Sequence, residues 1–165
     1  MTNEEILSQL KDKFPQVELG VQAEETKNFT IIVPAASLVN VTTHLRDHMG
    51  FDYLSDVTSV DYSDRFEVVY HLYSMKRGGT VLTLKVLLAD KEHAEVESVT
   101  PIWPGANFQE REVYDMMGIS FKNHPDLRRI LMWDGFPGYP LRKDFENRLY
   151  TFKELEPTRP KPPDW

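Results

Sequence analysis

The sequence predicts an α+β protein with two layers: a mainly antiparallel sheet packed with two or three helices, followed by an irregular, extended C-terminal segment. Over residues 1–97, apolar side chains recur with helical or two-residue spacing in the order helix, strand, strand, helix, strand, strand, strand. The connections between these strands are too short for parallel crossovers, which favours antiparallel pairing. Most of the eleven prolines lie beyond Ser98, so regular structure should be interrupted there.

The first three elements are a helix and two strands. Thr2 and Glu5 have the spacing of a capping box, and the apolar side chains after them recur at helical spacing until Pro15 ends the helix. Apolar and polar residues alternate over 17–23 and again over 29–33, which predicts two strands with a turn between them.

A second helix and three longer strands follow. Pro34 suits a first helical turn, apolar residues then recur on one face, and Gly50 suits the C-terminal end. Strands are predicted over 51–62, 66–75 and 80–88, with a glycine-rich hairpin turn before the last of them.

Beyond Ser98 the chain changes character. A helix is predicted over 105–117 with Gly118 as its stop, and residues 119–145 are predicted to be irregular. The chain therefore divides into an α+β body, a middle segment and an extended proline-rich tail, at residues 1–97, 98–146 and 147–165. The tail is either a disordered terminus or an arm that lies on a partner, with its aromatic residues as anchors.

Composition excludes several classes of function. The net charge of −7 argues against nucleic-acid binding, which needs a basic face. The absence of cysteine excludes disulfides, cysteine-ligated iron–sulfur clusters and thiol catalysis. No apolar run is long enough to span a membrane, and the acidic N-terminus does not have the pattern of a secretory signal. A cytoplasmic location fits these features.

Catalytic motifs are sparse. His44 and His48 are four residues apart on a predicted helix, but the glutamate of a zinc-protease motif is missing between them. Asp47 and Asp52 could complete a metal site with these histidines, but an exposed helix face is the simpler interpretation. There is no Gly-x-Ser-x-Gly elbow, no P-loop and no Gly-x-Gly-x-x-Gly.

The richest chemistry lies in residues 110–118 and 124–131, where acids, arginines and a histidine are interleaved with apolar residues. Such a mixture is typical of a surface held against another protein or of a catalytic cleft. Glu112 and Asp115 are spaced to meet on one face of the helix, and Arg111 is spaced to pair with Asp115.

These carboxylates have two interpretations. One is a general acid–base pair. The other is an ion-pair network with Arg128, Arg129 or Arg142 that fixes the irregular segment onto the helix, and we favour it because arginine forks are well suited to orienting carboxylates. On this interpretation, replacing Arg128 or Arg142 with alanine would leave a desolvated carboxylate unpaired.

The same residues resemble a family signature. The pattern Glu110-Arg111-Glu112, two residues, Asp115-Met116-Met117, six residues, His124, three residues, Arg128-Arg129-Ile130 resembles that of the C subunit of bacterial NADH–quinone oxidoreductase. That protein is the counterpart of the 30-kDa subunit of mitochondrial respiratory complex I. The stretches 103–108 and 138–145 also resemble the family, and the close match covers residues 98–146.

The resemblance implies a peripheral subunit of the hydrophilic arm, at the cytoplasmic face of the bacterial cell membrane, which meets the membrane only through its complex. It implies no cofactor bound by this chain, whereas the parent complex uses NADH, FMN, iron–sulfur clusters and quinone and translocates ions. It also implies packing against the D subunit, which shapes the quinone pocket, and a position near the cluster-bearing B and I subunits.

On this interpretation no residue is catalytic, and a set of signature residues orders the irregular segment and docks it on partners. These residues are Glu110, Arg111, Glu112, Asp115, His124, Pro125, Leu127, Arg128, Arg129, Leu131, Pro140, Leu141, Arg142 and Lys143.

Two alternatives remain open from the sequence. The first is an equivalent adaptor subunit in a ferredoxin-dependent quinone oxidoreductase or a membrane-bound hydrogenase complex. The second is an autonomous soluble enzyme that uses the carboxylate-rich segment, for which turnover by the isolated protein would be required.

Overall fold

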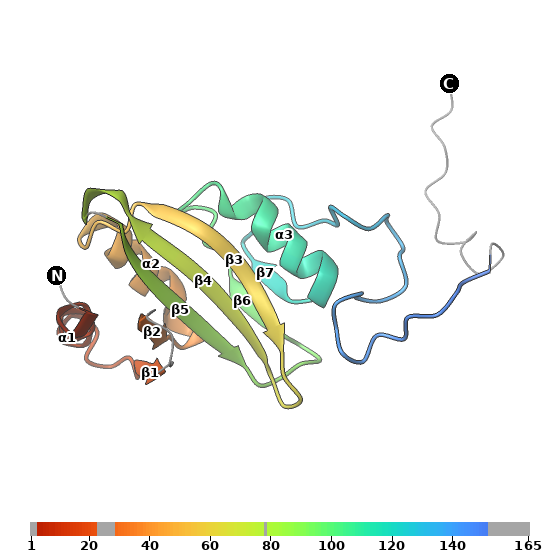
Figure 1. The fold of residues 1–165 in the computed structure, drawn as a ribbon, viewed down its shortest axis with the longest axis horizontal. Coiled ribbons are helices and arrows are strands. Elements are labelled where there is room, and N and C mark those ends of the chain that lie inside the picture. Colours follow the sequence, from red (N-terminus) through yellow and green to blue (C-terminus); the bar gives the residue numbers. More distant parts are fainter. Residues whose placement is uncertain (1–2, 23–28, 78, 152–165) are drawn as a thin grey trace, which may run out of the picture.

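The computed structural model describes residues 3–22, 29–77 and 79–151, and shows a sheet with helices followed by a long C-terminal segment (Figure 1). The elements are α1 (Asn3–Lys13), β1 (Gly20–Gln22), β2 (Phe29–Ile32), a 3₁₀ turn η1 (Ala35–Ser37), α2 (Leu38–Asp47), β3 (Tyr53–Asp61), β4 (Phe66–Ser74), a 3₁₀ turn η2 (Met75–Arg77), β5 (Thr80–Leu88), β6 (Glu95–Glu97), α3 (Ala106–Met117) and β7 (Ser120–Lys122). The predicted order of helices and strands up to β5 is confirmed.

The main sheet has the strand order β1-β2-β5-β4-β3. Neighbouring strands are antiparallel except for β2 and β5, which pair in parallel with Phe29 opposite Leu82. The prediction of a mainly antiparallel sheet is confirmed. The parallel pair forms because the chain passes through α2, β3 and β4 between β2 and β5, which is long enough for a crossover.

One face of this sheet and the helices share a single core. Along β4, alternate side chains are fully buried: Phe66, Val68, Tyr70 and Leu72. Their cross-strand partners on β5 are also buried, and α3 packs against β3. The helices α1 and α2 add apolar side chains to the same core, namely Ile6, Leu10, Leu38, Val41 and Leu45. The predicted two-layer α+β fold is confirmed.

The helix α3 carries buried charged side chains as well as apolar ones. It ends at Gly118, whose φ of 73° lies in the left-handed region, so the predicted helix and its stop are both confirmed. Val113 and Met116 face the core, while Glu110 and Asp115 are also buried on this helix. Two carboxylates are thus carried into the protein interior and require partners there.

Residues 119–145 were predicted to be irregular throughout, and this is wrong for one short stretch. The strand β7 pairs in parallel with β6, with Val96 opposite Phe121. Both side chains are buried. Three-residue strands are too short to show a two-residue alternation in the sequence, which is why this second sheet was missed.

Smaller differences concern boundaries. The second helix begins at Leu38 after the 3₁₀ turn, and the first strand begins at Gly20 instead of at residue 17. Thr2 of the capping box, the turn after β1, Gly78 of the hairpin and the tail from residue 152 lie outside the described residues. Among the described residues, no helix combines the length and the apolar character needed to cross a bilayer.

Candidate functional site

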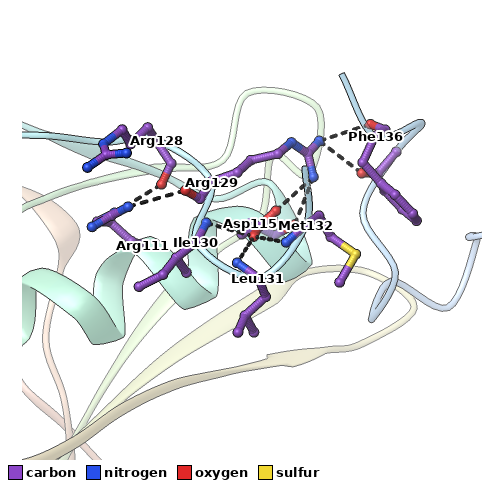
Figure 2. Close-up of polar contacts among 9 residues, drawn as sticks. Arg111, Asp115, Arg128, Arg129, Ile130, Leu131, Met132 and Phe136 are labelled. Carbon is purple, nitrogen blue, oxygen red and sulfur yellow. Dashed lines mark hydrogen bonds and ion pairs between the residues drawn. The ribbon is translucent and has the colours of Figure 1, made fainter. Parts of the chain in front are cut away.

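The side chain of Asp115 organises the segment after β7. One carboxylate oxygen, Oδ2, accepts backbone N–H groups from Ile130 at 3.0 Å, Leu131 at 2.7 Å and Met132 at 2.8 Å. The other oxygen, Oδ1, accepts from the Arg129 guanidinium at 2.8 Å (Figure 2). Four donors therefore converge on one buried carboxylate and fix the backbone of residues 129–132 to α3.

The donors also set the ionisation of Asp115. Burial by itself raises the pKa of this carboxyl, but the three backbone N–H groups and Arg129 more than offset it, so the pKa lies below its usual range. The group is therefore an anion at neutral pH. An anion that is held by four fixed donors is a structural anchor and a poor general base.

Arg129 extends this anchor to the next stretch of chain. Its Nη2 atom donates to the carbonyl oxygens of Phe136 at 3.3 Å and Gly138 at 3.0 Å. Its guanidinium also lies 5.2 Å from the ring centroid of Tyr139. One arginine thus holds both the start and the end of the loop 129–138.

Arg111 does not pair with Asp115, contrary to the spacing-based prediction. Its Nε and Nη2 atoms donate instead to the carbonyl oxygens of Arg128 at 3.1 Å and Arg129 at 3.2 Å (Figure 2). The predicted contact between Glu112 and Asp115 is also wrong, because Glu112 is exposed while Asp115 is buried. The side chains of Arg111 and Asp115 therefore do not pair with each other, and both hydrogen-bond to backbone groups of the same loop.

Glu110 holds a different stretch of chain. Its carboxylate accepts from the Ser98 hydroxyl at 2.6 Å, the Val99 backbone N–H at 2.7 Å and the Thr100 hydroxyl at 3.2 Å. Burial raises the pKa of Glu110, and these donors and His124 offset the rise only in part. No arginine within the described residues reaches this carboxylate, so the predicted arginine network does not include it.

The side chain of His124 is buried beside Glu110. Its Nε2 atom lies 3.9 Å from the carboxylate and 3.1 Å from the carbonyl oxygen of Asn107, while Nδ1 accepts the backbone N–H of Asp126 at 3.0 Å. Since Nδ1 accepts, Nε2 carries a proton and donates. The histidine therefore fastens the turn after β7 to α3.

Arg142 caps the C-terminal end of α3. Its Nε atom donates to the Met117 carbonyl at 2.6 Å and its Nη2 to the Lys91 carbonyl at 3.2 Å, and the Leu141 N–H donates to Met116 at 3.1 Å. The donors to Met116 and Met117 satisfy carbonyl groups that a helix end leaves without partners, and the donor to Lys91 ties the same arginine to the loop after β5. The prediction that Arg142 pairs with a carboxylate is wrong, because its fork engages backbone oxygens.

Tyr139 and Gly118 were not singled out together in the sequence. A Cβ atom on Gly118 would lie 2.5 Å from the Tyr139 ring, so the close approach requires glycine. The Tyr139 ring also contacts the guanidinium of Arg142, which lies 4.9 Å from the ring centroid. Sequence spacing contains no signal for this contact, because it joins a helix end to a loop 21 residues later.

The remaining signature residues are mostly on the surface. Arg128 is exposed and pairs with the exposed Asp126, so the prediction that it neutralises a buried carboxylate is wrong. Leu131 and Leu141 are 57% and 62% exposed, although both belong to the anchored segment. Of the others, Pro125 and Lys143 are exposed, and Leu127 and Pro140 are half-buried.

One buried carboxylate outside α3 was missed by the sequence analysis. Asp61, at the end of β3, accepts from Lys91 at 2.5 Å and from the Lys143 backbone N–H at 2.8 Å. Burial raises the pKa of Asp61, but Lys91 and the Lys143 N–H more than offset the rise and lower it. This contact attaches residue 143 to the main sheet, and only the tertiary fold brings the two together.

No metal centre is found among the described residues. The rings of His44 and His48 lie side by side with centroids 4.8 Å apart. Within the described part of the chain, however, no three histidine, aspartate or glutamate side chains gather in a way that suits a metal ion.

The fold and the polar contacts around α3 together define a two-layer α+β protein whose buried carboxylates anchor a long, irregular C-terminal segment. Residues 31–151 match the family model described as the 30 Kd subunit of the respiratory-chain NADH dehydrogenase, and the chain belongs to that family.

Named relatives agree with the family. The chain is 46% identical over 149 residues to the C subunit of NADH-quinone oxidoreductase from Moorella thermoacetica, covering 88% of this chain and 95% of that protein. It is 41% identical over 147 residues to the protein of the same name from Geobacter sulfurreducens, covering 87% and 89%. Among solved structures, a chain of the membrane-bound sulfane sulfur reductase, an archaeal respiratory membrane complex, is similar with a TM-score of 0.73 and 28% identity, covering 87% of this chain and 85% of that one.

Proposed function

We propose that this chain is a non-catalytic structural subunit in the hydrophilic arm of an ion-translocating NADH–quinone oxidoreductase. Its family membership and the names of its relatives support this assignment. The single observation that supports a structural role is that the charged signature residues of α3 and of the loop after β7 bind groups of this protein itself. Asp115, Arg129 and Arg111 are all engaged by backbone groups of one loop, and Asp115 and Arg129 also pair with each other, so they build a surface and leave no free acid–base pair among themselves.

The surface that results has the character of an interface. Leu131, Leu141 and Phe108 are 57%, 62% and 63% exposed, and the first two sit on backbone that is hydrogen-bonded to α3. Large apolar side chains held outward on a fixed backbone lose little conformational entropy on binding, which favours association. We refer to Phe108, Leu131 and Leu141 as the apolar docking residues.

Membership of the family supports a proposal about the partners. We propose that the apolar docking residues lie against the D subunit, which shapes the quinone pocket, close to the cluster-bearing B and I subunits. The chain then acts at the cytoplasmic face of the cell membrane without entering the bilayer. NADH, FMN, the iron–sulfur clusters and the quinone belong to other subunits of the complex, and this chain binds none of them.

Isolation of the native complex tests this function. The N-terminally tagged chain is expressed in its own host, and the membranes are extracted in mild detergent and purified through the tag. Mass spectrometry should identify cluster-bearing subunits together with an NADH-oxidising flavoprotein. Recovery of the chain alone, with the complex intact elsewhere in the preparation, would refute the proposal and would call for activity assays on the isolated protein.

A second candidate function is supported by the structural neighbour. The archaeal sulfane sulfur reductase complex contains a chain of the same fold, so this fold also occurs in a respiratory complex of another name. The equivalent role here would be that of an adaptor subunit in a ferredoxin-dependent quinone oxidoreductase or a membrane-bound hydrogenase. Recovery of cluster-bearing subunits without a flavoprotein in the same purification would favour it.

A further inference from the structure

The ring of Tyr139 contacts both of the arginines that anchor the C-terminal segment. The guanidinium carbon of Arg129 lies 5.2 Å from the ring centroid, and that of Arg142 lies 4.9 Å from it. Arg129 holds the loop 129–138, and Arg142 caps the end of α3. One aromatic ring is therefore shared by two anchors that hold different parts of the segment.

Each of these arginines also contacts a second ring. The guanidinium of Arg142 lies 4.9 Å from the ring centroid of Phe66, a fully buried residue of β4, and that of Arg129 lies 6.0 Å from the ring centroid of Phe136. Rings and cations thus alternate from the core of the main sheet to the loop. We refer to Phe66, Arg142, Tyr139, Arg129 and Phe136 as the cation–ring row.

Tyr139 takes part in this row through its ring alone. Its hydroxyl has no hydrogen-bond partner among the residues that the structure describes. Two guanidinium groups held near each other repel, and the negative face of an aromatic ring offsets part of that repulsion. Loss of the ring would therefore weaken both arginine contacts at once, which is the condition for cooperative behaviour.

The row also joins the two leucines of the apolar docking residues. The N–H of Leu131 donates to Asp115 at 2.7 Å, and the N–H of Leu141 donates to the Met116 carbonyl at 3.1 Å. Each leucine lies within two residues of an arginine of the row. The exchange of these two amides with solvent therefore reports separately on the two ends of the row.

We propose that Tyr139 is a positioning residue that couples the two arginine anchors. The shared ring makes the opening of one anchor unfavourable for the other, so Leu131 and Leu141 are held in place as one preformed unit. The meaning of this unit for docking rests on the function proposed above. The coupling itself is a property of the isolated chain and can be measured there.

Amide hydrogen exchange of the isolated full-length chain, followed by NMR, tests the coupling. In the native chain, the opening equilibria of the Leu131 and Leu141 amides should agree within about threefold, because they open together. The variant Tyr139→Leu keeps an apolar side chain but removes the ring, so the protection of both amides should fall by about tenfold. A loss at only one of the two amides, or at neither, would overturn the proposal.

Two control variants identify the ring as the coupling group. Tyr139→Phe lacks only the hydroxyl, so both amides should keep their native protection. Tyr150→Leu removes a tyrosine–arginine contact outside the row, in which the guanidinium of Arg148 lies 4.4 Å from the ring centroid, and should also leave both amides unchanged. A loss of protection in either control would contradict the proposal, because the effect would then not depend on the ring of Tyr139.

The amides of β4 separate local opening from global unfolding. If they too lose protection in Tyr139→Leu, the milder variant Arg129→Lys decides. It keeps the charge but removes the planar fork at one end of the row, and it should lower the protection of Leu141 at the other end. A loss confined to Leu131 would refute the coupling. Recovery of the chain with other subunits, which tests the proposed function, is a separate result.

Discussion

At the scale of single residues, the two adjacent arginines Arg128 and Arg129 have opposite roles. The side chain of Arg129 is 14% exposed and is paired with the fully buried Asp115, whereas that of Arg128 is 67% exposed and is paired with Asp126 at the surface. Breaking a buried charged pair leaves its anion with fewer donors, whereas in an exposed pair water takes the place of the lost partner.

We therefore expect Arg129→Ala to lower the free energy of unfolding by about 2–3 kcal/mol, because Asp115 keeps its three backbone donors but loses its cation. Arg128→Ala is the matched control and should leave the free energy of unfolding unchanged. Urea denaturation followed by circular dichroism measures both variants. A similar loss in the two variants would mean that the burial difference has no energetic consequence.

At the scale of elements, the junction between α3 and the C-terminal segment depends on Gly118. Its φ of 73° is unfavourable for other residues, and a Cβ there would lie 2.5 Å from Tyr139. Gly118→Ala should cost about 1–2 kcal/mol from the backbone alone and more from displacement of the tyrosine ring.

Gly105→Ala is the control at the other end of the same helix. Its φ is −63° and its Cβ would meet nothing within 4 Å, so the free energy of unfolding should change by less than about 0.5 kcal/mol. Thermal unfolding of both variants measures the difference. If Gly118→Ala is as stable as Gly105→Ala, Tyr139 is not held against the helix end.

The elements also show what a sequence can predict. The helix α3 was predicted to within one residue because its apolar residues recur at helical spacing and Gly118 supplies a stop. The partners of Arg111 and Arg142 were not predicted, because helical spacing suggests side-chain pairs, whereas both guanidinium groups donate to carbonyl oxygens distant in sequence. The contact of Asp61 with Lys143 was missed for the same reason, since it spans 82 residues.

At the scale of the whole molecule, two buried carboxylates on α3 should give opposite dependences of stability on pH. Asp115 has a pKa below its usual range, so its stabilising contribution is present above the unfolded-state pKa of about 3.9 and is lost as the pH falls through the lower folded-state value. Glu110 has a raised pKa, so its contribution is fully present below about pH 4.3 and is lost as the pH rises through the folded-state value.

Two variants separate these contributions. The destabilisation by Asp115→Asn should be largest at pH 7 and should shrink as the pH falls below about 4. Glu110→Gln should behave in the opposite sense, with a stability relative to the native chain that is better at pH 7 than at pH 4. Chemical denaturation of the three proteins at several pH values measures both trends, and parallel curves would contradict the opposed pKa shifts.

The assembled complex tests the central claim, which is that the segment 129–142, held against α3 by Asp115 and Arg142, is a docking surface. The variant Leu131→Asp with Leu141→Asp places charges on two apolar docking residues, and Met75→Asp alters an exposed apolar residue in η2, the turn between β4 and β5. The measurement is the amount of each tagged chain recovered with cluster-bearing subunits after purification in mild detergent. Our account predicts that the double variant folds but is lost from the complex while Met75→Asp is retained at the native level. Full retention of the double variant would contradict it.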